Sequence, residues 1–167
     1  MKQSNKAISP VISDLLLLVT IIVITSIAWI LGMPYIERLT ELRNFEESKQ
    51  VLLLIDNGIR EIATDIGSAK EINLNLGEAK RIDVNALSDE IRMEMESFSG
   101  FIAEDTRFKE NNLFYERNGT RLVIGLDYNG SGIDLNSSVS LSKGLKRLEL
   151  IDANHSGGRA VINLRVR

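Results

Sequence analysis

The sequence predicts an α+β protein in which a long N-terminal hydrophobic helix continues into an amphipathic helical extension packed on a C-terminal antiparallel β-sandwich. Residues 15–33 carry no charged side chain, and this is the length of a membrane-spanning helix. Between residues 34 and 67 the apolar residues recur every three or four positions, as on one face of a helix. From residue 68 to residue 167 the apolar period changes to two, which is typical of β-strands.

The hydrophobic segment, residues 8–33, is predicted to insert into a membrane. Its uncharged part, residues 15–33, spans roughly 28 Å as a helix, which is close to the thickness of a bilayer's hydrocarbon core. A core helix of a soluble protein would show a polar face over this length, whereas only Thr20, Thr25 and Ser26 are polar here. Their hydroxyls can bond to carbonyls of their own helix, so they are expected to cost little free energy in lipid.

The start of the segment is suited to proteolysis ahead of the helix. Ser9 is a good N-cap and Pro10 a good first helical residue, and the proline favours extended backbone at the residue before it. The chain from Lys6 to Ser9 should therefore be extended, which is the backbone that proteases bind. An ordinary signal peptide is cut after its apolar stretch, but here that stretch is followed by GMPYIERL, which has no convincing small-residue site.

The N-terminal region has a short basic leader, then a small residue, then the sequence ISPVI and a hydrophobic helix. It resembles the N-terminal region of archaeal type IV pilins. The resemblance implies a type IV pilin-like fold and a class III signal peptide cut by a prepilin peptidase. Residues 1–7 would be the leader, Lys6 its basic residue, Ala7 its last residue and Ile8 the new N-terminus. Two residues depart from the family pattern: alanine stands at position 7, where glycine is commoner, and Asp14 stands where these pilins are usually apolar or small.

Asp14 has two interpretations. It can lie hydrated at the cytoplasmic membrane interface, just before the uncharged span. Alternatively, it can form a salt bridge with the freed amine of Ile8, as an acid near the mature N-terminus does in bacterial pilins. Six helical residues separate the two groups by about 600° of rotation, so they point to nearly opposite faces of one helix. The pair would therefore have to form between neighbouring subunits, and an acid in lipid needs such a partner.

The second helical segment, residues 34–67, is predicted to be amphipathic. Gly32 and Pro34 are expected to interrupt and kink the helix where the two segments meet. Gly67 is a suitable residue to end it. Leu53 and Leu54 exceed what one stripe needs, so they would be buried under a second layer or used against a neighbouring subunit. The apolar stripe consists of Ile36, Leu39, Leu42, Phe45, Leu52, Ile55, Ile59, Ile62 and Ile66.

The head domain, residues 68–167, is predicted to contain seven to nine short strands packed on the amphipathic helix. Alternating apolar residues mark strands in EINLNL, RIDVNAL and EIRMEMESF, and place Met93 and Met95 in the core. A β-hairpin with Asn118-Gly119 as its turn is predicted in LFYERNGTRLVIGLDY. GIDLNSSVSL and the last 23 residues supply three or four further strands, the last two joined by a glycine-rich turn.

An extracytoplasmic head is indicated by sequons and by charge. Four glycosylation sequons lie at predicted turns, beginning at Asn118, Asn129, Asn136 and Asn154. Lys2 and Lys6 precede the span, and Glu37, Glu41, Glu46 and Glu47 follow it. This asymmetry predicts a single-pass protein with its N-terminus in the cytoplasm and its head outside the cell membrane.

Catalysis and cofactor chemistry are not expected. The chain has no cysteine, and its one histidine, His155, lies in a turn-like stretch without a set of partner residues. We find no phosphate-binding loop, nucleophile elbow or metalloprotease motif, and no loop with the ligand spacing of a calcium site. The net charge of −3 comes without a basic stripe, which argues against a nucleic-acid partner. No catalytic residue, metal or cofactor is therefore predicted.

Two functions from different classes agree with these features. In the first, the chain is a pilin or minor pilin, a structural subunit of an archaeal type IV pilus-like surface filament. Its partners would then be the prepilin peptidase, the membrane, and copies of itself or related pilins. In the second, it is a permanently membrane-anchored binding or adhesion module, and the helix is only a tether. The fate of Lys6, Ala7 and Ile8 separates them, because a tether has no need of a leader that can be cut.

Overall fold

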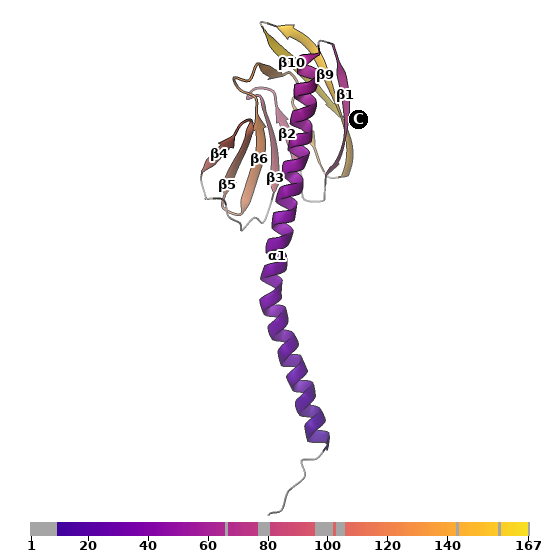
Figure 1. Ribbon diagram of the computed structural model, residues 1–167, viewed down its shortest axis with the longest axis vertical. Helices are drawn as coiled ribbons and strands as arrows, with labels where there is room; N and C mark the ends of the chain where they lie inside the picture. The colour runs from indigo at the N-terminus through magenta and orange to yellow at the C-terminus, as the bar shows by residue number, and fades with distance from the viewer. Residues whose placement is uncertain are drawn as a thin grey trace, which may run out of the picture. The chain divides into compact units, whose positions relative to one another are not determined.

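The structure is a computed structural model, and it describes residues 10–65, 67–76, 81–95, 102, 106–142, 144–156 and 158–166. In this part of the chain one helix is followed by ten strands, which confirms an α+β protein with a long N-terminal helix (Figure 1). The elements are α1 (Pro10–Thr64), β1 (Ala69–Leu76), β2 (Arg81–Asn85), β3 (Glu90–Met95), β4 (Arg107–Glu110), β5 (Leu113–Asn118), β6 (Arg121–Asp127), β7 (Ile133–Leu135), β8 (Val139–Leu141), β9 (Gly144–Ser156) and β10 (Arg159–Val166).

Helix α1 is one continuous element. The chain divides into two compact units, Met1–Thr40 and Glu41–Arg167, and α1 contributes residues to both. The predicted interruption at Gly32 and Pro34 is wrong, because both residues lie inside the unbroken helix. A proline removes only one backbone donor, and an apolar helix that is intact on both sides can tolerate this loss.

The turn that follows α1 is bonded to the distant strand β9. The helix ends at Thr64, and Gly67 then adopts a φ of 77°, the left-handed conformation that glycine takes without strain. The N–H of Gly67 donates to Oδ2 of Asp152 at 2.9 Å. The helix thus ends three residues before Gly67, and Gly67 lies in the turn that follows, where its N–H is satisfied by a carboxylate of β9.

A four-stranded sheet has the order β1-β9-β10-β7. The pairs β1–β9 and β9–β10 are antiparallel, but β7 pairs with β10 in the parallel direction, with Ala160 opposite Ile133 and Ile162 opposite Leu135. The prediction of a wholly antiparallel head is therefore wrong at this pair. Strand β7 reaches β10 through the intervening β8 and β9, and a connection of this length leaves its direction free.

A six-stranded sheet has the order β4-β5-β6-β3-β2-β8, and all of its pairs are antiparallel. The β5–β6 hairpin was expected to turn at Asn118-Gly119, and this is wrong by one residue. Asn118 pairs with Arg121, so Gly119 and Thr120 form the turn. Gly119 has a φ of 61° at the first central position, where a type II′ turn requires glycine.

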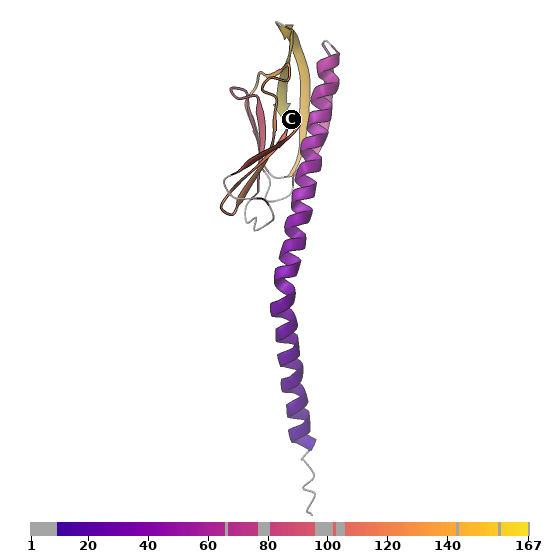
Figure 2. The ribbon, with the colours of Figure 1, turned by 60° about the vertical axis from the view of Figure 1, so that its left-hand side comes forward.

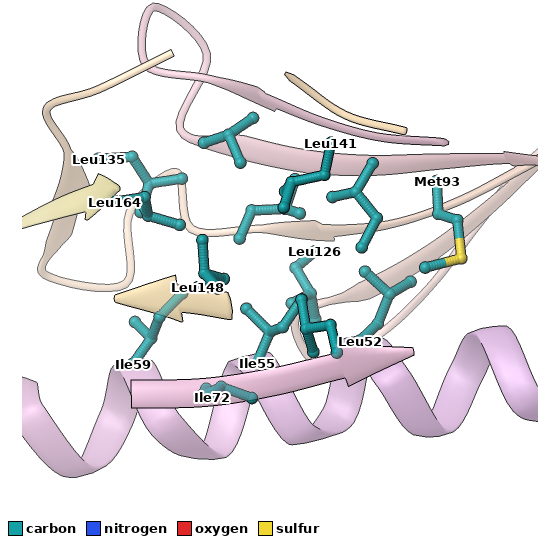
Figure 3. Packing of buried hydrophobic residues seen from close by; sticks show 14 of the residues in the cluster. Leu52, Ile55, Ile59, Ile72, Met93, Leu126, Leu135, Leu141, Leu148 and Leu164 are labelled. Atoms are coloured by element: carbon teal, nitrogen blue, oxygen red, sulfur yellow. The ribbon is translucent and has the colours of Figure 1, made fainter. Parts of the chain in front are cut away.

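Both sheets share one hydrophobic core with the segment of α1 that follows Thr40 (Figures 2 and 3). Met93 and Met95 are buried in this core, as predicted. From the helix, the core takes Phe45, Leu52, Ile55, Ile59 and Ile62. Gly58 lets the helix approach the four-stranded sheet closely, because a Cβ there would lie 2.6 Å from Cδ1 of Ile72 and 3.0 Å from Cδ1 of Leu150.

Several large apolar residues of α1 that do not face the core are not covered by the described residues. Within the predicted apolar stripe, Ile36, Leu39 and Leu42 are exposed, whereas its members from Phe45 to Ile62 are buried. Ile66, the last residue of the stripe, lies outside the described residues. The surplus leucines of the sequence VLLLI are also exposed, since Leu53 and Leu54 point away from the core formed by their neighbours Leu52 and Ile55. Burial of these two leucines under a second layer of the same head is therefore excluded.

Candidate functional site

The first candidate site is the apolar part of α1. From Ile12 to Leu31 its large apolar side chains are exposed, and Trp29 reaches 68% exposure. Within the described residues, α1 is the one helix long and apolar enough to cross a membrane. A helix that is apolar on all sides is stable only when lipid or other protein surfaces cover it. This helix near the N-terminus therefore has the properties of a membrane anchor or a signal segment.

The polar side chains of this helix satisfy their hydrogen bonds within the helix. The hydroxyls of Thr20, Thr25 and Ser26 donate to the carbonyls of Leu16, Ile21 and Ile22, each at 2.8 Å. This confirms the predicted bonding back to the helix. Each hydroxyl thus brings no unsatisfied donor into an apolar surrounding, where such a group would cost several kcal/mol.

The predicted cleavage residues Lys6, Ala7 and Ile8 lie outside the described residues. Asp14 lies within α1, and its carboxylate is exposed. No hydrogen bond or ion pair joins Asp14 to any other described residue, so the described part of the chain holds no partner for it. Both interpretations of Asp14, the hydrated interfacial acid and the intersubunit pair, remain predictions.

Three of the four sequon asparagines are exposed on the head. Asn118 is the last residue of β5 and Asn129 lies in the turn after β6, so the two stand at opposite ends of β6. Asn136 lies between β7 and β8, and its Nδ2 donates to Oδ1 of Asn163 at 3.0 Å. The side chain of Asn154, on β9, lies outside the described residues. The structure therefore does not gather the sequons into one site.

A buried polar pair joins α1 to the end of β6, and periodicity gave no signal for it. The hydroxyl of Tyr128 donates to Oδ1 of Asp56 at 2.8 Å, and Nε of Arg60 donates to Oδ2 at 2.8 Å. Tyr128 is fully buried. Burial, followed by the charge and the hydrogen bond of Asp56, raises the pKa of Tyr128. The tyrosine therefore stays a neutral donor that fixes the helix to the six-stranded sheet.

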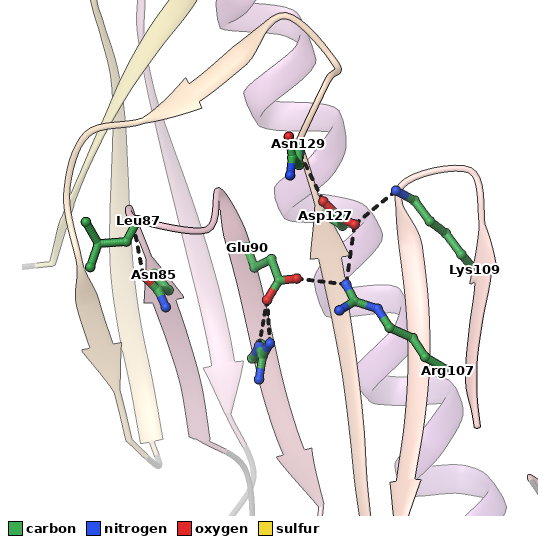
Figure 4. A network of polar contacts seen from close by, with 8 residues as sticks. Asn85, Leu87, Glu90, Arg107, Lys109, Asp127 and Asn129 are labelled. Atoms are coloured by element: carbon green, nitrogen blue, oxygen red, sulfur yellow. Dashed lines mark hydrogen bonds and ion pairs between the residues drawn. The ribbon is translucent and has the colours of Figure 1, made fainter. Parts of the chain in front are cut away.

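A charged cluster lies on the outer face of the six-stranded sheet (Figure 4). Glu90 of β3 is buried and accepts bonds from Arg92 at 2.6 and 2.8 Å and from Arg107 of β4 at 2.8 Å. Asp127 accepts bonds from Lys109 at 2.9 Å and from Arg107 at 3.3 Å. Arg107 therefore links the two carboxylates, and the cluster ties together β3, β4 and β6.

The cluster covers an aromatic ring that is buried outside the main core. The guanidinium of Arg107 stacks 3.9 Å from the ring centroid of Phe114, and that of Arg92 lies 5.9 Å from it. Beneath the ring lies Gly125, where a Cβ would be 2.4 Å from Cζ of Phe114 and 2.5 Å from the carbonyl oxygen of Ile91. The ring of Phe114 thus fits between a glycine and an arginine.

A cavity of about 510 Å³ opens beside this cluster. Within the described part of the chain, its lining residues are Arg92, Arg107, Glu116, Arg117 and Asn118. All of these side chains are polar, and three arginines stand against one glutamate, so the lining favours an anionic group. Periodicity and motifs do not reveal this cavity, because its residues come from three strands and only Asn118 belongs to a motif, the sequon of the β5–β6 turn.

Acid should weaken the folded state through the two carboxylates of the cluster. Burial opposes ionisation of Glu90, but the bonds from Arg107 and Arg92 outweigh it and hold its pKa below the ordinary value. For Asp127, burial is likewise outweighed by the bonds from Lys109 and the N–H of Asn129, and its pKa is lowered. A lowered folded-state pKa stabilises the protein above the unfolded-state pKa, and this stabilisation is lost as pH falls through the folded-state value.

We therefore expect the free energy of unfolding to be steady near neutral pH and to fall below about pH 4.5, where these carboxyls ionise in the unfolded chain. Urea unfolding of wild type and of Glu90→Gln at about pH 6 and about pH 3 measures this. The stability difference between the two proteins should shrink at the lower pH, because protonated Glu90 loses its charge-assisted bonds. A difference that stays constant would contradict the role given to the Glu90 carboxylate.

No protein-family model, no curated protein and no solved structure matches this chain. Within the described residues, no group of three or more histidine, cysteine, aspartate or glutamate side chains is placed to hold a metal ion. The features that point to a function are therefore the apolar helix with the sequence ahead of it and the polar outer face of the head.

Proposed function

We propose that the protein is a structural subunit, a pilin or minor pilin, of an archaeal type IV pilus-like surface filament. The observation that carries this proposal is the apolar helix of residues 15–33, which follows Lys6-Ala7-Ile8-Ser9-Pro10 and continues without a break into the helix of the head. Before assembly the helix would be covered by lipid. After cleavage and assembly, apolar side chains of neighbouring subunits would replace the lipid around it.

Three features of the described residues support this proposal. The apolar side chains are exposed on all sides of the helix, so they are available to lipid or to several neighbours. The helix of the apolar segment continues along the chain into the helical residues that belong to the head's core. The exposed sequons at Asn118, Asn129 and Asn136 are suited to glycosylation of a head outside the cell membrane.

The alternative is a permanently anchored extracytoplasmic binding or adhesion module. The polar cavity beside Arg92 and Arg107 favours it, because a structural subunit has no need of a cavity in its head. The two functions differ in the fate of the N-terminus. A filament subunit is cut ahead of its helix, whereas a tether keeps all of its residues.

Cleavage between Ala7 and Ile8 is the test of the proposal. Mass spectrometry of N-terminal peptides from native membranes should find a mature form that begins at Ile8. Ala7→Leu and Lys6→Glu should each make the uncut form accumulate in the membrane, because they alter the residues next to the cut. Lys2→Glu is the matched control, since it changes the same charge farther from the cut and should leave cleavage intact. If the uncut form were the only one in wild-type cells, the filament proposal would fail.

Asp14 is expected to matter for assembly if it pairs with the Ile8 amine of a neighbouring subunit. Asp14→Ala should then lower filament yield by about tenfold or more at equal amounts of mature protein, because breaking a desolvated charge pair leaves one charge uncompensated. Sheared surface filaments and intersubunit cross-links measure the yield, and Ser13→Ala is the neighbouring control. A yield equal to wild type would identify Asp14 as a hydrated acid at the membrane interface, where ion pairs contribute little.

A further inference from the structure

The cavity of about 510 Å³ on the head has the construction of a ligand site. Its volume falls within the range of about 300–1,000 Å³ that is common for small-molecule sites. Two of its arginines are already held in position, since the buried carboxylate of Glu90 accepts hydrogen bonds from both Arg92 and Arg107. Stacking of Arg107 on the ring of Phe114 further limits its movement. A ligand would therefore meet guanidinium groups that are preorganised.

These two guanidinium groups retain donors for a ligand. Arg92 uses Nε and Nη2 on Glu90, and Arg107 uses Nη2 on Glu90 and Asp127. Among the described residues, no group accepts a bond from Nη1 of Arg92 or from Nε and Nη1 of Arg107. By contrast, Arg117 donates to the carbonyls of Gly119 and Ile102. Binding of an anionic group is therefore assigned to Arg92 and Arg107.

The remainder of the lining defines what the anionic group is attached to. Glu116 and Asn118 supply a carboxylate and an amide, which accept hydrogen bonds from hydroxyl groups. None of the described residues that line the cavity is apolar, so they offer no buried contact to an acyl chain or an apolar peptide side chain. A saccharide that carries a carboxylate matches all of these groups.

We propose that this cavity binds an acidic saccharide, with its carboxylate on Arg92 and Arg107 and its hydroxyls on Glu116 and Asn118. The inference goes beyond the filament proposal and does not depend on it, because the cavity belongs to the head alone. In molecules whose Asn118 carries no glycan, the cavity would give a filament subunit or an anchored module the same ability to recognise uronic-acid sugars outside the cell.

The test is isothermal titration calorimetry on the full chain in a non-ionic detergent, produced in a host that does not N-glycosylate, so that Asn118 is bare. The probes are glucuronate, glucose as the neutral sugar, and acetate as the anion without a sugar. Glucuronate should bind at least about tenfold more tightly than either control, because only glucuronate engages both the guanidinium groups and the hydroxyl acceptors.

Four variants locate the site. Arg107→Gln and Arg92→Gln should each weaken glucuronate binding by at least about tenfold. Arg81→Gln is the matched control and should bind as wild type does, because Arg81 is on the same sheet and bonds to Asp83 and Ser140 but does not line the cavity. Asn118→Trp should block the cavity without disturbing the bonds of Glu90. It therefore separates loss of binding from loss of folding, and the melting temperature shows whether each variant is folded.

The proposal would be overturned by absence of glucuronate binding, or by equal binding of glucose and glucuronate. Equal binding of acetate and glucuronate would overturn it too, because the cavity would then be an anion site without sugar recognition. A folded Asn118→Trp protein that binds as wild type does would place the ligand elsewhere on the head.

Discussion

A fragment of residues 34–167 is expected to fold as a soluble β-rich unit, whereas a fragment of residues 68–167 is expected to remain unfolded. The described residues before Pro34 add nothing to the core of the head, since Phe45 is the first helical residue in that core. The helix from Glu41 onward, by contrast, belongs to the same compact unit as all ten strands.

The unfolding expected for the 68–167 fragment follows from the burial of helix side chains in the core of the head. Five large apolar side chains of α1 are buried in the core of the head, and burying each one stabilises by about 1.5–3 kcal/mol. Together they contribute roughly 8–15 kcal/mol, which is comparable with the whole stability of about 5–15 kcal/mol that is typical of a domain. The two sheets alone would also expose the apolar surfaces that the helix covers. Loss of the helix should therefore abolish folding.

Circular dichroism and urea unfolding of the two fragments measure the difference. Within the folded fragment, Ile55→Ala should lower the free energy of unfolding by about 3 kcal/mol, and its neighbour Leu54→Ala by under about 1 kcal/mol. Ile55 is fully buried, whereas Leu54 is 49% exposed on the opposite face of the helix. A cooperative unfolding transition of the 68–167 fragment, or equal effects of the two variants, would contradict the role of this helix.

Gly125→Val is expected to be among the most destabilising substitutions in the head, at about 3 kcal/mol or more. A side chain at this position meets Cζ of Phe114 at 2.4 Å and the backbone oxygen of Ile91 at 2.5 Å. The strand cannot move away, because β6 is paired on both sides, with Arg92 of β3 and Phe114 of β5 opposite Gly125. The gain of up to about 1 kcal/mol from replacing a flexible glycine is smaller than this cost.

The stability of Gly125→Val is compared with that of Gly58→Ala by urea unfolding of the 34–167 fragment. At Gly58 the new Cβ meets only the ends of the Ile72 and Leu150 side chains, which can rotate away. Alanine also gains about 1 kcal/mol of helix propensity over glycine, so we expect a net change within about 1 kcal/mol. If Gly125→Val were no more destabilising than Gly58→Ala, the close packing of Phe114 on β6 would be refuted.

The sequence by itself determined the features that depend on neighbours along the chain. The absence of charge from Leu15 to Met33 is enough to predict an apolar helix, and hydroxyls at Thr20, Thr25 and Ser26 bond within one helical turn. Alternation likewise predicted the strands around Ile72 and the burial of Met93. In each case the cause lies in contiguous sequence: an uninterrupted apolar run, a bond to the carbonyl one helical turn earlier, or an alternation of period two.

The tertiary structure alone decided which distant residues meet. Asp56 and Tyr128 are 72 positions apart, and nothing local indicates that one will satisfy the other. Strand β4 has four exposed residues and a single aromatic, Phe108, so alternation could not reveal it, yet it brings Arg107 to Glu90. The arginine-lined cavity arises because the pairing of β3, β6, β5 and β4 sets these charged side chains side by side. Register between strands is a long-range property, and it is set by which apolar faces close the core together.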